Sequence, residues 1–145
     1  MTFLLDVNVL IALIDPAHIS HDAAHCWFDT AGKTSWATCP LTENGVIRIV
    51  GHPSYPNTPG SPADVATIMT RMCGLAGHIF WPDSLSLTNA ADVDRSQVLT
   101  SAQVTDTYLL ALARANGGKL ATFDRRLSTK AVRMGSKALH VIGNS

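Results

Sequence analysis

Two aspartates in the sequence come directly after short apolar stretches. Asp6 follows Phe3-Leu4-Leu5, and Asp124 follows "LATF". In an open α/β sheet, ligands bind beyond the carboxyl ends of the strands. If both stretches are strands, the two carboxylates should lie at the edge of the sheet where ligands bind.

Two further acids stand near the starts of stretches with helical periodicity. Glu43 lies in "PLTENGVIRIV", and Asp106 lies in "QVTDTYLLALA", just ahead of a long apolar run. Either acid alone would suit the positive end of a helix dipole. Four carboxylates gathered at one edge would instead repel one another, which raises their pKa values and destabilises the fold unless a cation is bound. Oxygen ligands suit Mg²⁺, with Mn²⁺ as the other possibility. We therefore predict that the catalytic and metal-binding residues are one set: Asp6, Glu43, Asp106 and Asp124.

The chemistry that such a site supports is hydrolysis of a phosphate ester. A divalent ion lowers the pKa of a bound water, which attacks phosphorus, and it stabilises the charge on the leaving oxygen. Asn8 and Thr122 each stand two residues from a strand-end aspartate. Their side chains are predicted to hydrogen-bond these carboxylates or a bound water.

The elements that must position these residues alternate along the chain. Helical segments are predicted from near Ser20 to about Thr30, from about Leu41 to Val50, from the "SPAD" start at Ser61, and from about Ala102 to Ala115. Strands alternating with helices indicate a three-layer α/β fold with a mostly parallel central sheet and helices on both faces. The predicted strands are residues 2–5, 35–38, 78–81, 119–123 and 139–142.

Length and composition indicate a single domain that spans residues 1–145. Hydrophobic residues make up 46% of the chain and charged residues 15%, as in an ordinary globular protein. No apolar run approaches the ~20 residues that span a bilayer, and the N-terminus does not resemble a signal peptide. We therefore expect a cytoplasmic protein with no membrane association. The three cysteines lack CxxC spacing and are expected to be reduced thiols.

Charge is distributed unevenly although the net charge is zero. From Arg114 onward there are seven basic residues and one acid, so this part of the chain can attract a polyanion. A solvated charged helix is the other explanation. Arg125 and Arg126 follow Asp124 and are predicted to position a substrate backbone. The basic residues at spacings of four, three and four would share one face of a helix; they are Arg126, Lys130, Arg133 and Lys137.

Three segments together resemble the motif set of PIN-domain ribonucleases: "LLDVNVLIAL", "LTENGVIRI" and "VTDTYLLALARANGGKLATFDRRL". The match is best to the toxin subunits of VapBC-type toxin–antitoxin pairs. The resemblance implies that the four acids hold Mg²⁺ or Mn²⁺ and that Thr122 occupies the hydroxyl position beside the last acid. It also implies an RNA substrate, cleavage to a 3′-hydroxyl and a 5′-phosphate, a cognate antitoxin protein and a homodimer.

Two other functions stay open at this point. One is a non-catalytic RNA-binding or interaction module whose acids hold a structural ion, and the other is a metal-dependent phosphomonoesterase. His18, His21, His25 and Cys26 have zinc-like spacing, but no second pair of ligands accompanies them, which favours a polar helix face. The proline-rich segment 51–62 is expected to be a stiff surface connection.

Overall fold

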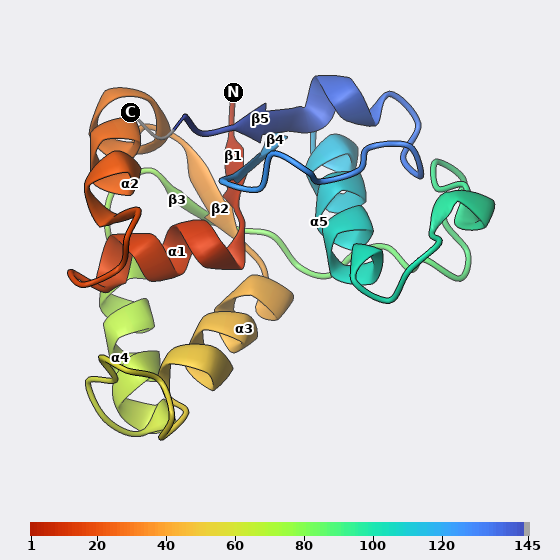
Figure 1. Cartoon of the computed structure of the whole chain (residues 1–145). Helices are drawn as coiled ribbons and strands as arrows, with labels where there is room; N and C mark the ends of the chain where they lie inside the picture. Colours follow the sequence, from red (N-terminus) through yellow and green to blue (C-terminus); the bar gives the residue numbers. More distant parts are fainter. Residues whose placement is uncertain (144–145) are drawn as a thin grey trace.

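A five-stranded sheet forms the centre of the molecule in the computed structural model, which describes residues 1–143 (Figure 1). The last two residues of the expected domain, 144 and 145, lie outside the described part. The strand order is β3-β2-β1-β4-β5, and every neighbouring pair is parallel. The strands are β1 (Phe3–Leu5), β2 (Trp36–Thr38), β3 (His78–Phe80), β4 (Lys119–Thr122) and β5 (Leu139–Val141). All five predicted strands are therefore confirmed.

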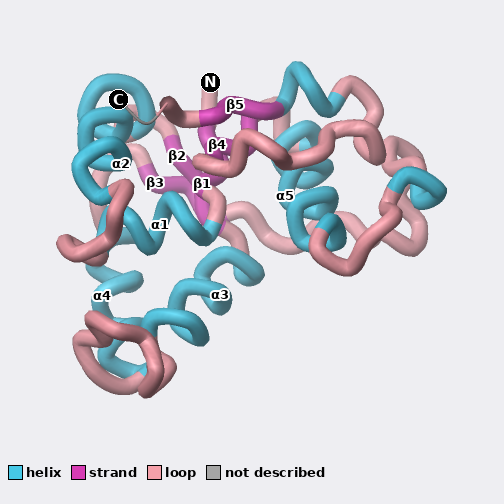
Figure 2. Tube along the Cα trace, viewed as in Figure 1, coloured by secondary structure: helices cyan, strands magenta, loops and turns pink. Residues whose placement is uncertain are grey.

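Helices cover both faces of the sheet, as predicted for an α/β fold (Figure 2). One face carries α5 (Gln103–Ala115), and the other carries the four helices from the first half of the chain. These are α1 (Val7–Ile14), α2 (His21–Trp27), α3 (Pro40–Val50) and α4 (Pro62–Cys73). A π-helical turn (Phe28–Gly32) continues α2, and short 3₁₀ turns cover Arg95–Gln97 and Gly135–Ala138.

Two hydrophobic cores lie on opposite sides of the sheet because side chains alternate along each strand. Leu4 and Leu120 pack with α5, whereas Leu5 and Ala121 pack with α1, α3 and α4. The same alternation sends Asp6 and Thr122, at the ends of β1 and β4, to the α5 side. The alternation of side chains along the strands therefore brings Asp6 and Thr122 to the same side of the sheet.

Helix α1 is an element that the sequence pattern did not predict. Its sequence, VNVLIALI, is apolar nearly all round, and five of its eight residues are buried. A helix buried on most sides loses the polar face that makes helical periodicity visible. Asp6 marks its start, because the Asp6 carboxylate accepts a hydrogen bond from the backbone N–H of Val7 at 2.8 Å.

The helix on which the basic residues after Asp124 were expected to share a face is absent. Residues 125–134 form turns and loops, and only the 3₁₀ turn Gly135–Ala138 follows. Gly135 is buried, and a side chain there would meet the Thr129 carbonyl oxygen at 2.8 Å. The chain at Gly135 therefore packs closely against the loop at Thr129 and does not continue as a helix. The prediction that Arg126, Lys130, Arg133 and Lys137 share one face of a helix is therefore wrong.

The proline-rich segment connects α3 to α4 as irregular chain, as expected. Asp15, after α1, holds it: Asp15 accepts hydrogen bonds from the Tyr55 hydroxyl and, at 2.7 Å, from the Asn57 side chain. Across residues 1–143, no helix has both the length and the apolar character needed to cross a membrane.

Candidate metal centre and active site

Asp6 lies where β1 ends and α1 begins, and it is only 8% exposed. Its carboxylate accepts two hydrogen bonds, one from the Val7 backbone and one from the Thr122 hydroxyl at 2.7 Å. Burial nevertheless raises the pKa of Asp6, and the charge of Asp124 raises it further. The local structure therefore makes the ionised form of this carboxylate more costly than in a solvent-exposed aspartate, and a nearby positive charge would offset that cost.

Asp124 reaches the same place from the neighbouring strand. Thr122, the last residue of β4, is fully buried and accepts a hydrogen bond from the Asp124 backbone N–H at 3.1 Å. The Asp124 carboxylate in turn accepts from the backbone N–H of Arg126 at 2.9 Å. Thr122 thus joins the ends of β1 and β4, because one hydroxyl contacts both Asp6 and the chain at Asp124.

Asp106 completes a group of three acids from the first turn of α5. Its pKa is raised to about 6, first by burial and then by the charges of Asp6 and Asp124. No cationic side chain among residues 1–143 forms a salt bridge with any of the three. Three mutually repelling carboxylates without a cationic partner fit an oxygen-ligand site for a divalent cation.

Glu43 does not belong to this group in the structure. Its carboxylate accepts a hydrogen bond from the Thr38 hydroxyl at 2.6 Å, and its charge acts on the pKa values of Cys73 and His78. Glu43 is not among the charges that raise the pKa values of Asp6 or Asp106. Three of the four predicted acids therefore come together, and the part of Glu43 in that set stays a prediction.

Thr38, the hydrogen-bond partner of Glu43, lies on a different face of the sheet from Asp6. Thr38 shares its strand face with Trp36, which packs in the core of the α1 side, whereas Asp6 follows the alternation to the α5 side. Burial affects the neighbours of Glu43 too: it lowers the pKa of His78 and raises that of the Cys73 thiol. Glu43, Cys73 and His78 each offer one ligand atom, and these atoms lie within 4.8 Å of one another.

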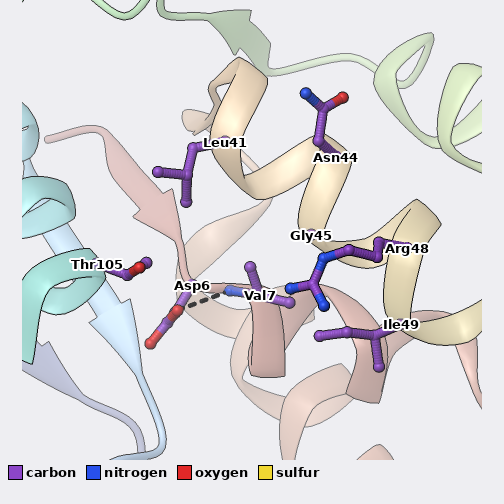
Figure 3. Close-up of a pocket in the computed structure, with 8 residues that line it drawn as sticks. All are labelled: Asp6, Val7, Leu41, Asn44, Gly45, Arg48, Ile49 and Thr105. Carbon is purple, nitrogen blue, oxygen red and sulfur yellow. Dashed lines mark hydrogen bonds between the residues drawn. The ribbon is translucent and has the colours of Figure 1, made fainter. Parts of the chain in front are cut away.

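A cavity of about 570 Å³ opens beside Asp6 and contains residues that sequence reasoning missed. Asn44, Gly45 and Arg48 line it from α3, and Thr105 lines it from α5 (Figure 3). Arg48 brings a positive charge into a cavity next to an acid. The spacing of residues 44, 45 and 48 is that of one helix face, and this signal identifies them only when the facing element is known.

Asn8 and Thr122 were predicted to hydrogen-bond the carboxylates or a bound water. Thr122 contacts Asp6 as described. The side-chain oxygen of Asn8 is buried and has no hydrogen-bond partner among the described residues. Such an oxygen is expected to have a partner in the working protein, such as a bound water. The basic residues predicted to bind RNA are all exposed: Arg125, Arg126, Lys130, Arg133 and Lys137.

Two of the histidines with zinc-like spacing, His21 and His25, lie on α2 and contact the end of α1. His21 Nδ1 lies 2.7 Å from the carbonyl oxygen of Ala12, and His25 Nε2 lies 2.8 Å from that of Leu13. These carbonyls belong to the last turn of α1, where backbone acceptors lack helical partners. The polar face of α2 that the sequence predicted therefore provides hydrogen-bond partners for the C-terminal end of α1.

Residues 3–132 match the model of the PIN-domain family, and the all-parallel sheet with helices on both faces is consistent with that fold. The chain belongs to the PIN-domain family. It is 45% identical to Ribonuclease VapC39 of Mycobacterium tuberculosis (strain ATCC 25618 / H37Rv) over 131 residues, which cover 90% of this chain and 94% of that protein. It is 39% identical to Ribonuclease VapC44 of the same strain over 132 residues, covering 91% and 92% of the two chains. Within the family it is therefore of the VapC type, as its motifs predicted.

Proposed function

We propose that this protein is a Mg²⁺-dependent endoribonuclease, the toxin of a type II toxin–antitoxin pair. The observation that carries the proposal is the meeting of Asp6, Asp106 and Asp124 without a salt-bridge partner among residues 1–143, in a chain similar to named ribonucleases. The proposed ligand set is these three acids together with Glu43, which would have to turn from Thr38 to join them. Mn²⁺ is the alternative ion.

The proposed reaction is hydrolysis of an RNA phosphodiester to a 3′-hydroxyl and a 5′-phosphate. When bound, Mg²⁺ supplies a water of lowered pKa and positive charge for the phosphate oxygens. Residues of this chain orient the acids. Thr122 and the Val7 backbone N–H hydrogen-bond the two carboxylate oxygens of Asp6, and the Thr122 hydroxyl, at the end of β4, accepts from the Asp124 N–H. Arg48 in the cavity, and Arg125 and Arg126 after Asp124, are proposed to contact the RNA backbone.

The proposed partners are a cognate antitoxin and a second copy of this chain. An acidic centre that binds a divalent ion also suits an arginine, because a guanidinium pairs with carboxylates in a bidentate manner. We expect an antitoxin whose arginine competes with Mg²⁺ for these acids.

The proposal is tested by incubating the purified chain with structured RNA and Mg²⁺. We expect cleavage that EDTA abolishes and that added Mg²⁺ restores, with 5′-phosphate ends on the downstream products. Binding without cleavage would favour an RNA-binding module instead. Release of inorganic phosphate from a small ester, without RNA cleavage, would favour a phosphomonoesterase.

The exposed basic residues near the C-terminus provide a prediction about binding. Replacing Lys130, Arg133 and Lys137 together with Ser should weaken RNA binding and reduce the salt dependence of the binding constant. Each lost phosphate contact lowers the slope of log K against log salt by about 0.7–0.9. The cleavage position should not change, because phosphate contacts do not read bases.

A matched control removes the same charge from exposed positions elsewhere: Lys33, Arg71 and Arg95, each changed to Ser. Filter binding or fluorescence anisotropy from low to moderate salt measures both slopes. Equal slopes for the two triple variants would show that the C-terminal residues form only a solvated surface.

A further inference from the structure

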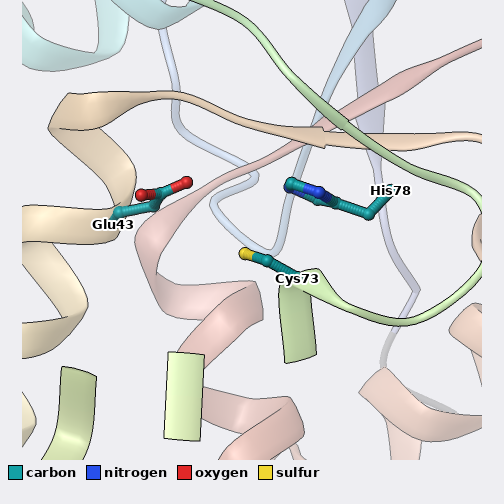
Figure 4. Close-up of side chains that lie close together, drawn as sticks. All are labelled: Glu43, Cys73 and His78. Atoms are coloured by element: carbon teal, nitrogen blue, oxygen red, sulfur yellow. The ribbon is translucent and has the colours of Figure 1, made fainter. Parts of the chain in front are cut away.

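Glu43, Cys73 and His78 converge from three different elements (Figure 4). Glu43 lies on α3, Cys73 is the last residue of α4, and His78 is the first residue of β3. We infer that these three side chains form a second metal site, selective for a borderline-soft divalent ion such as Zn²⁺.

The donor atoms decide which kind of ion this site would take. A thiolate sulfur, an imidazole nitrogen and one carboxylate oxygen are the ligands of Zn²⁺ and Co²⁺, whereas Mg²⁺ prefers oxygen alone. The three ligand atoms already lie within 4.8 Å of one another. Tetrahedral Zn²⁺ with bonds of about 2.0–2.3 Å requires them to approach to roughly 3.3–3.8 Å.

A buried hydroxyl pre-orients two of the ligands. Thr38 is fully buried, and its hydroxyl lies 2.6 Å from Glu43 Oε2 and 2.7 Å from His78 Nε2. Because the hydroxyl donates its proton to the Glu43 carboxylate, it accepts from the imidazole N–H. Cys73 Sγ lies 3.9 Å from the same hydroxyl. Such outer partners set the orientation of metal ligands.

The backbone between Cys73 and His78 holds them in place. Gly77 has a φ of +88°, and a side chain there would clash with the backbone carbonyl oxygen of Lys33. The turn therefore packs directly on the chain before β2. A cavity of about 420 Å³, lined by all three ligands and by α4, gives an ion and a fourth, water ligand access from solvent.

Binding would be a simple exchange: the divalent ion replaces the thiol proton of Cys73, which leaves to solvent. It would also hold Glu43 away from Asp6. If the proposed function is right, Zn²⁺ at this site inhibits the Mg²⁺-dependent cleavage by withholding Glu43 from the acidic group.

The test uses the full chain stripped of metal with EDTA and then titrated with Co²⁺. We expect one thiolate-to-cobalt charge-transfer band in the near ultraviolet, displaced by Zn²⁺. The band should be absent from Cys73→Ser and retained in Cys26→Ser, which changes an exposed thiol on α2. Zn²⁺ should also protect Cys73, and not Cys26, from alkylation in the unaltered chain, which covers the case in which Cys73→Ser fails to fold.

Absence of the band from the unaltered chain, or its persistence in Cys73→Ser, would overturn the site. RNA cleavage is a separate readout. Zn²⁺ should inhibit the unaltered chain and Cys26→Ser at least ~10-fold more strongly than Cys73→Ser. A band without that difference keeps the metal site and overturns its link to cleavage, and a chain that cleaves no RNA still reports on the site through the spectrum.

Discussion

Asp6→Asn should abolish RNA cleavage and, in the metal-free protein, raise the melting temperature. The amide keeps the geometry: its oxygen can still accept from the Val7 N–H, and its NH₂ group can donate to the Thr122 hydroxyl. Asn is also as good a helix N-cap as Asp. What disappears is one negative charge in a nearly buried position. We expect cleavage to fall by at least ~100-fold, since loss of a residue that only orients a metal ligand already costs 10–100-fold.

The stability change should depend on pH, because burial and Asp124 raise the pKa of Asp6 above its ordinary value of 3.8. Because the pKa of Asp6 is higher in the folded than in the unfolded state, its protonation contributes to folding stability. This contribution is fully present below the pKa of the unfolded state and is lost as the pH rises through the pKa of the folded state. Asparagine does not ionise, so the Asp6→Asn variant does not lose this stability as the pH rises. The variant should therefore melt a few degrees higher at neutral pH and nearly level with the unaltered protein below about pH 4.

Thermal melts at several pH values, with and without Mg²⁺, measure this effect. Mg²⁺ should raise the melting temperature of the unaltered protein and have less effect on the variant, because a ligand stabilises only a state that binds it. Asp29→Asn is the matched control, since Asp29 is exposed and lies on the π-helical turn after α2. Full cleavage by Asp6→Asn would remove Asp6 from the catalytic site.

Thr122→Val should reduce both stability and cleavage, although valine has nearly the shape of threonine. The hydroxyl donates to Asp6 and accepts from the Asp124 N–H, and the residue is fully buried. Its loss leaves two polar groups without a partner, which costs about 2 kcal/mol and lowers the melting temperature by ~4–8 °C. It also removes a hydrogen bond that lowers the pKa of Asp6. We expect Mg²⁺ affinity to fall 10–100-fold.

Thr122→Ser separates the hydroxyl from the side-chain volume. Serine keeps both hydrogen bonds and loses only a methyl group, so it should retain most of the Mg²⁺ affinity even if packing suffers. Isothermal titration with Mg²⁺ and melting curves of the two variants give the comparison. Equal Mg²⁺ affinity in Val and Ser variants would mean that the hydroxyl does not orient the metal ligands.

The strand-end acids illustrate what can be predicted from the sequence alone. Five short apolar stretches alternating with helices leave few topologies, since parallel crossovers are right-handed and helices must cover both faces. In such a sheet the residues after β1 and β4 meet at one edge. Asp6 and Asp124 were therefore predictable from their positions after the strands, and Asp106 from its place in the first turn of α5.

Helix α1 and the C-terminal segment were not predictable in the same way. A helix buried on most sides has no polar stripe, so the apolar run after Asp6 does not show the 3.6-residue period. In the C-terminal segment the basic residues have helical spacing, but the chain there packs through Gly135 and the buried Val132 and Ala138. Surface charges contribute little to helix formation compared with such packing.

The sequence by itself determined the strands and the parallel sheet, and it predicted a set of four acids, of which Asp6, Asp106 and Asp124 come together in the structure. Only the tertiary structure decided where Glu43 points and which residues join Asp6 in the cavity. The physical reason is the rotation of α3 about its own axis: residues 44 and 45 lie 100–200° around the helix from Glu43. That rotation depends on packing against α1 and α4, and it directs Arg48 towards Asp6 and Glu43 towards Cys73 and His78.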